Sequence, residues 1–294
     1  MGLKMKISEL LNSGKVTVSC EMFPPKVGTN LEQVQEIIRG IAALSPDFMS
    51  VTYGAGGSTS KRTSEIAAHI QNTYHIPALA HLTCVSSTKQ EIATMLDTLK
   101  ENGIENILAL RGDIPQDASF PSPMQYRYAY QLIEDVKAHN PDFCIGAACY
   151  PDGHVECEHK EDDIDHLKQK VDSGCDFLTS QMFFDNNVFY QFLYRILAKG
   201  IHIPVVAGIM PIMNSKQIKR SCELSGTDLP PRFKAIVDKF ADKPQAMRQA
   251  GIAYATEQII DLICNGVTAI HIYTMNKPDV AAEIMGNLSE IIRP

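Results

Sequence analysis

Glu21 is a carboxylate inside an apolar, β-branched run, residues 16–23, which ends at Pro24-Pro25. Acidic side chains are rarely buried without a partner, and an apolar wall raises the pKa of a carboxyl group toward that of a proton donor at neutral pH. The alternative is a strand with one solvent face that carries Glu21, because side chains alternate between the two faces of a strand. The run alone does not choose between these interpretations.

A second candidate is Arg111-Gly112-Asp113, which follows the apolar run 106–110. An arginine fork binds phosphate, a carboxylate can hydrogen-bond a heterocycle, and a glycine lets a ligand approach the backbone. The alternative is a salt-bridged turn without a ligand.

Three further patterns argue against a P-loop, a serine hydrolase and a zinc site. The glycine-rich stretch 54–59 lacks the spacing of a phosphate-binding P-loop, and no Gly-x-Ser-x-Gly elbow of a serine hydrolase occurs. His154, Glu156, Cys157 and His159 match no standard zinc spacing, so we expect no metal.

The elements that must position these residues are short apolar runs that alternate with helical patterns. Glycine follows several of the predicted helices, as at Gly103, Gly174, Gly200 and Gly266, where it can stop a helix in the left-handed conformation. Ser87 and Gln90 predict a capping box at a helix start. The eight predicted strands are 16–23, 48–53, 78–84, 106–111, 144–150, 177–183, 204–210 and 269–273.

Near-continuous apolarity is typical of parallel strands buried on both faces. Eight βα units therefore predict a (β/α)8 TIM barrel, a single domain over residues 1–294 with no second domain. The competing doubly wound sheet usually has fewer strands and a Gly-x-Gly-x-x-Gly turn after the first strand, which is absent.

In such barrels catalytic groups lie at the carboxyl ends of the strands. Polar residues gather at these ends, and Asp163, His166 and Lys170 share one face of a following helix by their spacing. The strand-end residues are Glu21, Thr52-Tyr53, His81 with Thr83, Arg111-Gly112-Asp113, Tyr150 with His154, Gln181, and Tyr273-Thr274 with Asn276.

Composition narrows the class of protein. The formal net charge of −7 argues against a dedicated nucleic-acid or anionic-membrane binder. No apolar stretch approaches the roughly 20 residues of a membrane span, and residues 1–15 do not resemble a secretory signal. The 8 cysteines are scattered, as expected for reduced thiols. We therefore expect a cytoplasmic protein that acts on small molecules.

Seven groups of residues, in chain order, together resemble the landmarks of methylenetetrahydrofolate reductase in its short bacterial form. They span nearly the whole chain. They are Glu21-Met22-Phe23-Pro24-Pro25, residues 50–57, His81-Leu82-Thr83-Cys84, Leu110-Arg111-Gly112-Asp113, Tyr150-Pro151 with His154, Gln181 with Phe183-Phe184-Asp185, and Gly208-Ile209-Met210-Pro211.

The resemblance implies a barrel that binds FAD non-covalently and reduces 5,10-methylenetetrahydrofolate to 5-methyltetrahydrofolate. Glu21 and Asp113 would be catalytic and also bind substrate, and Gln181, Gln217 and Lys277 would be further substrate positions. The implied FAD contacts are Thr52, Tyr53, Ala55, His81, Arg111, Gly112, Asp113, Tyr128, Ala129, Tyr150, His154, Asp163, His166 and Lys170.

The implied mechanism is ping-pong. NADH or NADPH gives a hydride to flavin N5 and leaves, and the folate takes its place. Protonation of folate N10 opens the five-membered ring, and Glu21 is the general acid. Asp113 would hydrogen-bond the pterin. A homo-oligomer is expected.

The alternatives are a non-catalytic flavin- or folate-binding subunit of a larger complex and a protein partner that supplies electrons. Lys277 stands where an arginine is frequent in the family, and Ser221 where some members have an aromatic. The choice between NADH and NADPH stays open.

Overall fold

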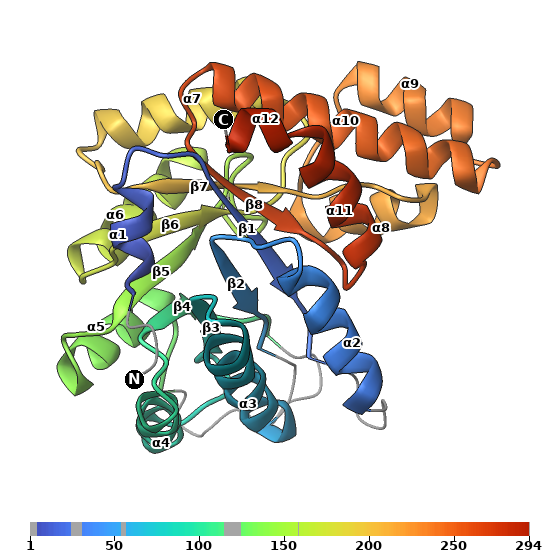
Figure 1. Ribbon diagram of the computed structural model, residues 1–294. Coiled ribbons are helices and arrows are strands. Elements are labelled where there is room, and N and C mark those ends of the chain that lie inside the picture. The colour runs from blue at the N-terminus through green and yellow to red at the C-terminus, as the bar shows by residue number, and fades with distance from the viewer. Residues whose placement is uncertain (1–4, 25–30, 54–56, 115–124, 158, 294) are drawn as a thin grey trace.

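Eight parallel strands close into a barrel in chain order, as the computed structural model shows for residues 5–24, 31–53, 57–114, 125–157 and 159–293 (Figure 1). The predicted (β/α)8 barrel is confirmed, and the doubly wound alternative is wrong because the sheet closes between its first and last strands. The strands are β1 (Thr17–Met22), β2 (Phe48–Val51), β3 (Ala78–Thr83), β4 (Asn106–Leu110), β5 (Cys144–Cys149), β6 (Phe177–Ser180), β7 (Val205–Ile209) and β8 (Ala269–Tyr273).

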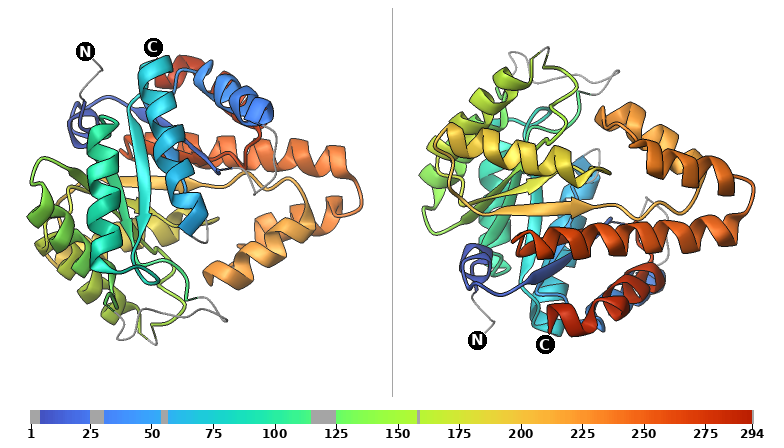
Figure 2. Two further views of the ribbon diagram at one scale, coloured as in Figure 1. Left: turned by 90° about the horizontal axis from the view of Figure 1, so that it is seen from below. Right: turned by 90° about the horizontal axis from the view of Figure 1, so that it is seen from above.

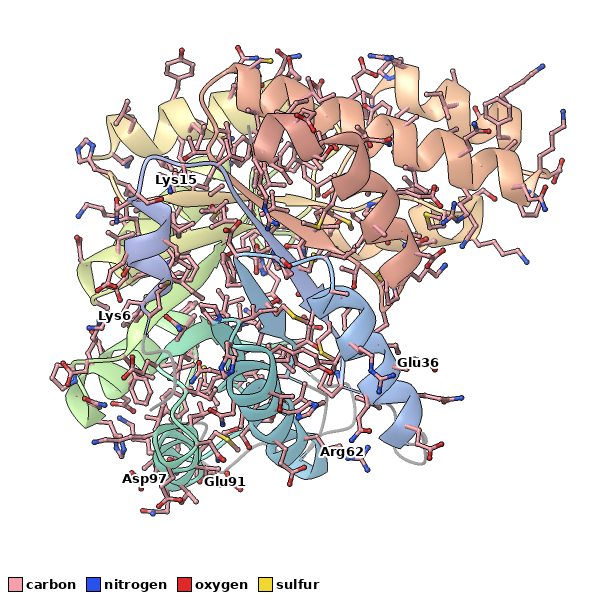
Figure 3. The ribbon with its side chains drawn as sticks, in the orientation of Figure 1. Lys6, Lys15, Glu36, Arg62, Glu91 and Asp97 are labelled. Atoms are coloured by element: carbon pink, nitrogen blue, oxygen red, sulfur yellow. The ribbon has the colours of Figure 1, made fainter. Side chains whose placement is uncertain are left out.

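Helices surround the barrel, and α8, α9 and the adjoining part of α10 extend from it as an arm (Figures 1 and 2). Charged side chains such as Glu36, Glu91 and Asp97 lie on the outer faces of helices (Figure 3). The helices are α1 (Ile7–Leu11), α2 (Leu31–Ala42), α3 (Gly57–Tyr74), α4 (Lys89–Glu101), α5 (Ala129–His139), α6 (Lys160–Asp172), α7 (Asn186–Ala198), α8 (Ser215–Ser225), α9 (Pro231–Phe240), α10 (Pro244–Cys264), α11 (Pro278–Asn287) and α12 (Ser289–Ile292).

Both faces of the strands are buried. In β1, Val18, Cys20 and Met22 belong to the core beneath the helices, and the alternate residues Thr17, Ser19 and Glu21 are also buried. A solvent-facing Glu21 is therefore excluded, since only 6% of the residue is exposed. The side-chain alternation of β1 directs the carboxylate into the barrel.

The amino-terminal end of the barrel is closed by α1. Ile7 and Leu11 pack on an inner layer of strand residues that includes Phe48 and Phe177. Asn106 at the start of β4 holds α1 in place, because its side chain accepts from Ile7 N at 2.8 Å and donates to the Met5 carbonyl oxygen at 3.2 Å. The inner residues toward the other end include buried polar side chains, among them Glu21, His81 and His271.

The helix boundaries follow local signals. The four glycines expected to stop helices all have positive φ, from 72° at Gly200 to 107° at Gly174. The predicted capping box is displaced by one residue: Thr88, not Ser87, caps α4 and exchanges hydrogen bonds with Glu91 rather than Gln90.

Within the described ranges, no helix combines the length and apolarity that crossing a bilayer requires.

Candidate functional site

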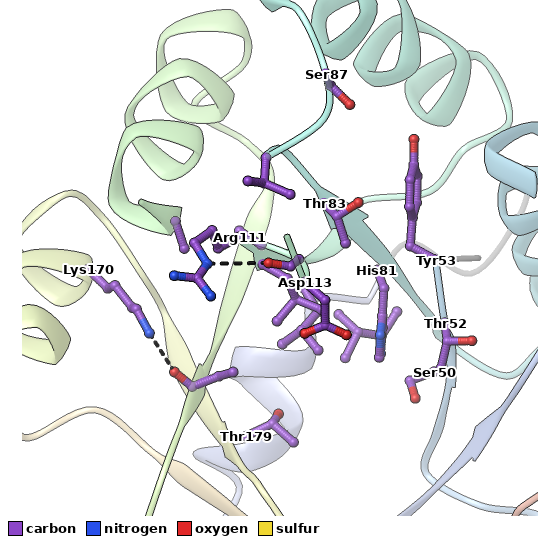
Figure 4. Close-up of a pocket in the computed structure, with 18 of the residues that line it drawn as sticks. Ser50, Thr52, Tyr53, His81, Thr83, Ser87, Arg111, Asp113, Lys170 and Thr179 are labelled. Atoms are coloured by element: carbon purple, nitrogen blue, oxygen red, sulfur yellow. Dashed lines mark hydrogen bonds between the residues drawn. The ribbon is translucent and has the colours of Figure 1, made fainter. Parts of the chain in front are cut away.

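A cavity of about 1530 Å³ opens at the carboxyl ends of the strands. It exceeds the roughly 300–1,000 Å³ of common small-molecule pockets, so a large ligand or two ligands together can enter. Polar side chains from β2, β3, β4 and β6 or the residues after them reach into the same space, among them Thr52, His81, Asp113 and Thr179 (Figure 4).

Glu21 lies in the inner wall of this cavity between two histidines. Its Oε2 is 3.9 Å from Nε2 of His81 and 3.9 Å from Nε2 of His271. His271 Nδ1 is 2.7 Å from the Ser19 hydroxyl, which fixes the ring in β8 beside β1. Burial lowers the pKa of His81 to about 4, although Glu21 opposes the shift. His81 is therefore neutral near neutral pH.

Two cavity-lining polar atoms have no hydrogen-bond partner within the described part of the chain. They are His81 Nε2 and Thr179 Oγ1, and both are buried. Buried polar groups normally find a partner, and an exception is typical of a site that a ligand completes.

The buried neutral imidazole predicts a pH-dependent stability. In the unfolded chain His81 binds a proton below about pH 6.5, whereas in the folded chain it does so only below about pH 4. The free energy of unfolding should thus decrease as pH falls through this window, by roughly 3 kcal/mol in total from this group. Urea unfolding of ligand-free protein at pH 7 and pH 4.5 measures this difference in the free energy of unfolding.

His81→Gln should reduce the loss of stability between these two pH values, since it removes the titrating group. His202→Gln, which removes an exposed imidazole, is the matched control. An unchanged pH dependence in His81→Gln would contradict the assigned cause.

Arg111 forms a bidentate ion pair with Glu156, and both N–O distances are 2.6 Å. This hydrogen bonding raises the pKa of Arg111 and lowers that of Glu156. The salt bridge considered for Arg111 thus goes to Glu156, across 45 residues, rather than to Asp113. Gly112 has φ +85°, and a Cβ there would lie 3.0 Å from Thr83 Cβ, so the turn needs a glycine.

A second cation, Lys170, lies deep in the same wall. Its Nζ donates to the Ala148 carbonyl oxygen at 2.9 Å and lies 5.8 Å from the centre of the Tyr150 ring. Burial lowers the pKa of Lys170, opposed by Asp163, and burial raises the pKa of Asp163, opposed by Lys170. The predicted helix face is formed, because Asp163, His166 and Lys170 all line the cavity.

Comparison with known proteins identifies the family. The sequence profile of methylenetetrahydrofolate reductase matches residues 6–289. The chain belongs to the methylenetetrahydrofolate reductase family. It is 32% identical to the 5,10-methylenetetrahydrofolate reductases of Pectobacterium carotovorum and Escherichia coli, over 99% and 96% of its length and 95% and 93% of theirs.

The chain spans about half the length of other reductases that it matches. It is 34% identical to methylenetetrahydrofolate reductase (NADH) 1 of Arabidopsis thaliana, over 97% of this chain and 50% of the plant protein. Among solved structures, a Clostridium thermocellum protein that binds two copies of 5-methyl-5,6,7,8-tetrahydrofolic acid has a TM-score of 0.63 at 15% identity, over 97% of this chain and 99% of that one. This second likeness shows the shared barrel fold.

Most positions that the reductase resemblance singles out lie on the cavity wall. Gln217 and Lys277 do not line it: Gln217 lies in the first turn of α8, and Lys277 precedes α11. Ala55 lies outside the described residues. The residues that do line the cavity are Glu21, Thr52, Tyr53, His81, Arg111, Gly112, Asp113, Tyr128, Ala129, Tyr150, His154, Asp163, His166, Lys170 and Gln181.

The reductase cavity also contains residues that the sequence did not single out as site residues. They include Ser50, Thr179 and His271. The sequence did contain a partial signal for them, because side chains two residues apart in a strand point to the same face. Each lies two residues before a strand-end residue that the sequence singled out. His271 and Tyr273 alternate with Ile270 and Ile272, as an inward polar series should.

Proposed function

We propose that this protein reduces 5,10-methylenetetrahydrofolate to 5-methyltetrahydrofolate, using FAD and a reduced nicotinamide, NADH or NADPH. The observation that carries the proposal is the buried Glu21 carboxylate in the inner wall of a large polar cavity. Membership of the reductase family supports it.

The residues of the cavity fit FAD. The orphaned His81 Nε2 can bond a polar atom of a flavin ring, and Gly112 leaves room for a ligand against the backbone. Lys170 and Arg111, which is paired with Glu156, would be the cations near a pyrophosphate. Tyr128 and His166 stack at 5.4 Å between ring centres and offer a flat surface at the rim.

The chain's own groups then have separate roles. Bound FAD would carry a hydride from the nicotinamide to the folate. Glu21 would donate a proton to folate N10, which opens the five-membered ring and makes the methylene carbon electrophilic. His81, being neutral, forms no ion pair with Glu21. Asp113 and Gln181 line the cavity and would bind the pterin.

The proposal is tested with purified protein. We expect a yellow protein with an FAD spectrum, which NADH or NADPH bleaches under anaerobic conditions and 5,10-methylenetetrahydrofolate restores. Protein that binds no FAD would defeat the proposal. Bound, reducible FAD that the folate leaves reduced would instead favour a non-catalytic subunit, and a flavin that neither nicotinamide reduces would favour an electron-transfer partner.

A cytoplasmic, homo-oligomeric enzyme remains our expectation. A folate-dependent methyltransferase, a different reaction class, would need a cobalamin or a zinc thiolate site. Among the described residues, no three His, Cys, Asp or Glu side chains are grouped to hold a metal ion.

A further inference from the structure

The turn after β8 carries two polar side chains that have no part in the proposed reaction, although they contact the end of β1. The Thr274 hydroxyl donates to the Glu21 carbonyl oxygen at 2.6 Å. The Asn276 side chain accepts from Phe23 N at 2.9 Å and donates to the Phe23 carbonyl oxygen at 3.1 Å. The turn therefore holds the backbone at Glu21 and again two residues later.

These contacts extend the sheet beyond its last backbone pair. The β1–β8 register ends with Glu21 opposite Tyr273. Phe23 lies past that pair, and the Asn276 amide bonds its N–H and its carbonyl group as a neighbouring strand would. Without that amide, the β1 backbone beyond Glu21 would lack this support on its β8 side.

The turn adopts a left-handed conformation that asparagine tolerates but that is strained at Met275. Met275 has φ +52° and Asn276 has φ +56°, both in the left-handed region. The other non-glycine residues with positive φ in the described ranges, Ser45 and His75, lie at the opposite end of the barrel, before β2 and β3. Such strain persists where surrounding contacts enforce it, and it is concentrated at functional sites. Here it brings Met275 to the cavity wall and the Asn276 amide to Phe23.

We propose that Asn276 is a positioning residue, which keeps the Glu21 carboxylate in place by holding the Phe23 backbone. The inference rests on the proposed role of Glu21 as the proton donor. A displacement of about 1 Å at a reacting group can lower a rate by about a hundredfold. Asn276 itself does not line the cavity, so its loss should act through the end of β1, where Glu21 and Phe23 both line it.

Asn276→Gly tests the proposal, because glycine keeps the positive φ and removes both hydrogen bonds. We expect the rate of folate-dependent flavin reoxidation to fall by about ten- to a hundredfold. Flavin reduction by the nicotinamide, which needs no proton from Glu21, should stay near the wild-type rate. Asn276→Asp keeps the oxygen that accepts from Phe23 N. Its rate of folate-dependent flavin reoxidation should lie between that of the wild type and that of Asn276→Gly.

Asn106→Ala is the matched control. Asn106 also bonds one N–H and one carbonyl group of the backbone, but at the closed end of the barrel. Both variants should unfold at lower urea concentration than the wild type, and only the Asn276 variant should lose the folate half-reaction selectively.

A normal folate rate in Asn276→Gly, or equal losses in both half-reactions, would overturn the positioning role alone. A wild-type protein that the folate does not reoxidise would overturn the proposed function, and the positioning role with it.

Discussion

Glu21→Gln is expected to lower the rate of folate-dependent flavin reoxidation by about 10²- to 10⁴-fold, the usual contribution of a general acid. The amide keeps the size and polarity of the side chain between His81 and His271 but cannot deliver a proton. Because His81 is neutral at the pH of the assay, it cannot replace the lost acid readily. Anaerobic stopped-flow absorbance of the flavin measures the rate.

The reductive half-reaction separates this role from a structural one. Hydride transfer from the nicotinamide requires no proton at N10, so flavin reduction should be nearly unchanged in Glu21→Gln. Glu257→Gln, which removes an exposed carboxylate that pairs with Arg232 on the arm, is the control for the substitution itself. Equal losses in both half-reactions of Glu21→Gln would show that the residue shapes the site rather than donating the proton.

The barrel could be predicted from sequence because each strand is buried on both faces. All eight apolar runs became strands, with ends that differ by up to three residues. The differences arise where the backbone leaves the ladder. The run 177–183 contains β6 only to Ser180, because the Gln181 side chain accepts from Met182 N and the chain turns away.

The candidate site could be predicted where it follows strand ends and on one helix face, that of Asp163, His166 and Lys170. Arg111, Asp113 and His81 stand out by position, since the carboxyl ends of barrel strands meet at one mouth. The ion pair of Arg111 with Glu156 could not be predicted, because it depends on two loops approaching in space. The same holds for Asn276 and Phe23, which are 253 residues apart in sequence. Local pattern carries no information about such contacts.

Gly208→Ala is expected to destabilise the protein by about 3 kcal/mol, at the upper end of the usual cost of overpacking. A Cβ at this position in β7 would lie 2.3 Å from the Ser180 carbonyl oxygen and 2.7 Å from the Tyr273 ring. The Tyr273 hydroxyl donates to that same carbonyl oxygen at 2.7 Å. The glycine therefore leaves the space in which the phenol crosses to β6. Urea unfolding measures the loss.

Two further variants test this explanation. Gly286→Ala in α11 meets nothing within 4 Å, so it should be neutral or stabilise by up to about 1 kcal/mol through helix propensity. Adding Tyr273→Phe to Gly208→Ala should not restore stability, because removing the hydroxyl leaves the 2.3 Å contact with the Ser180 carbonyl oxygen. Full rescue by the double variant would show that the phenol hydroxyl, rather than the β6 backbone, sets the space at Gly208.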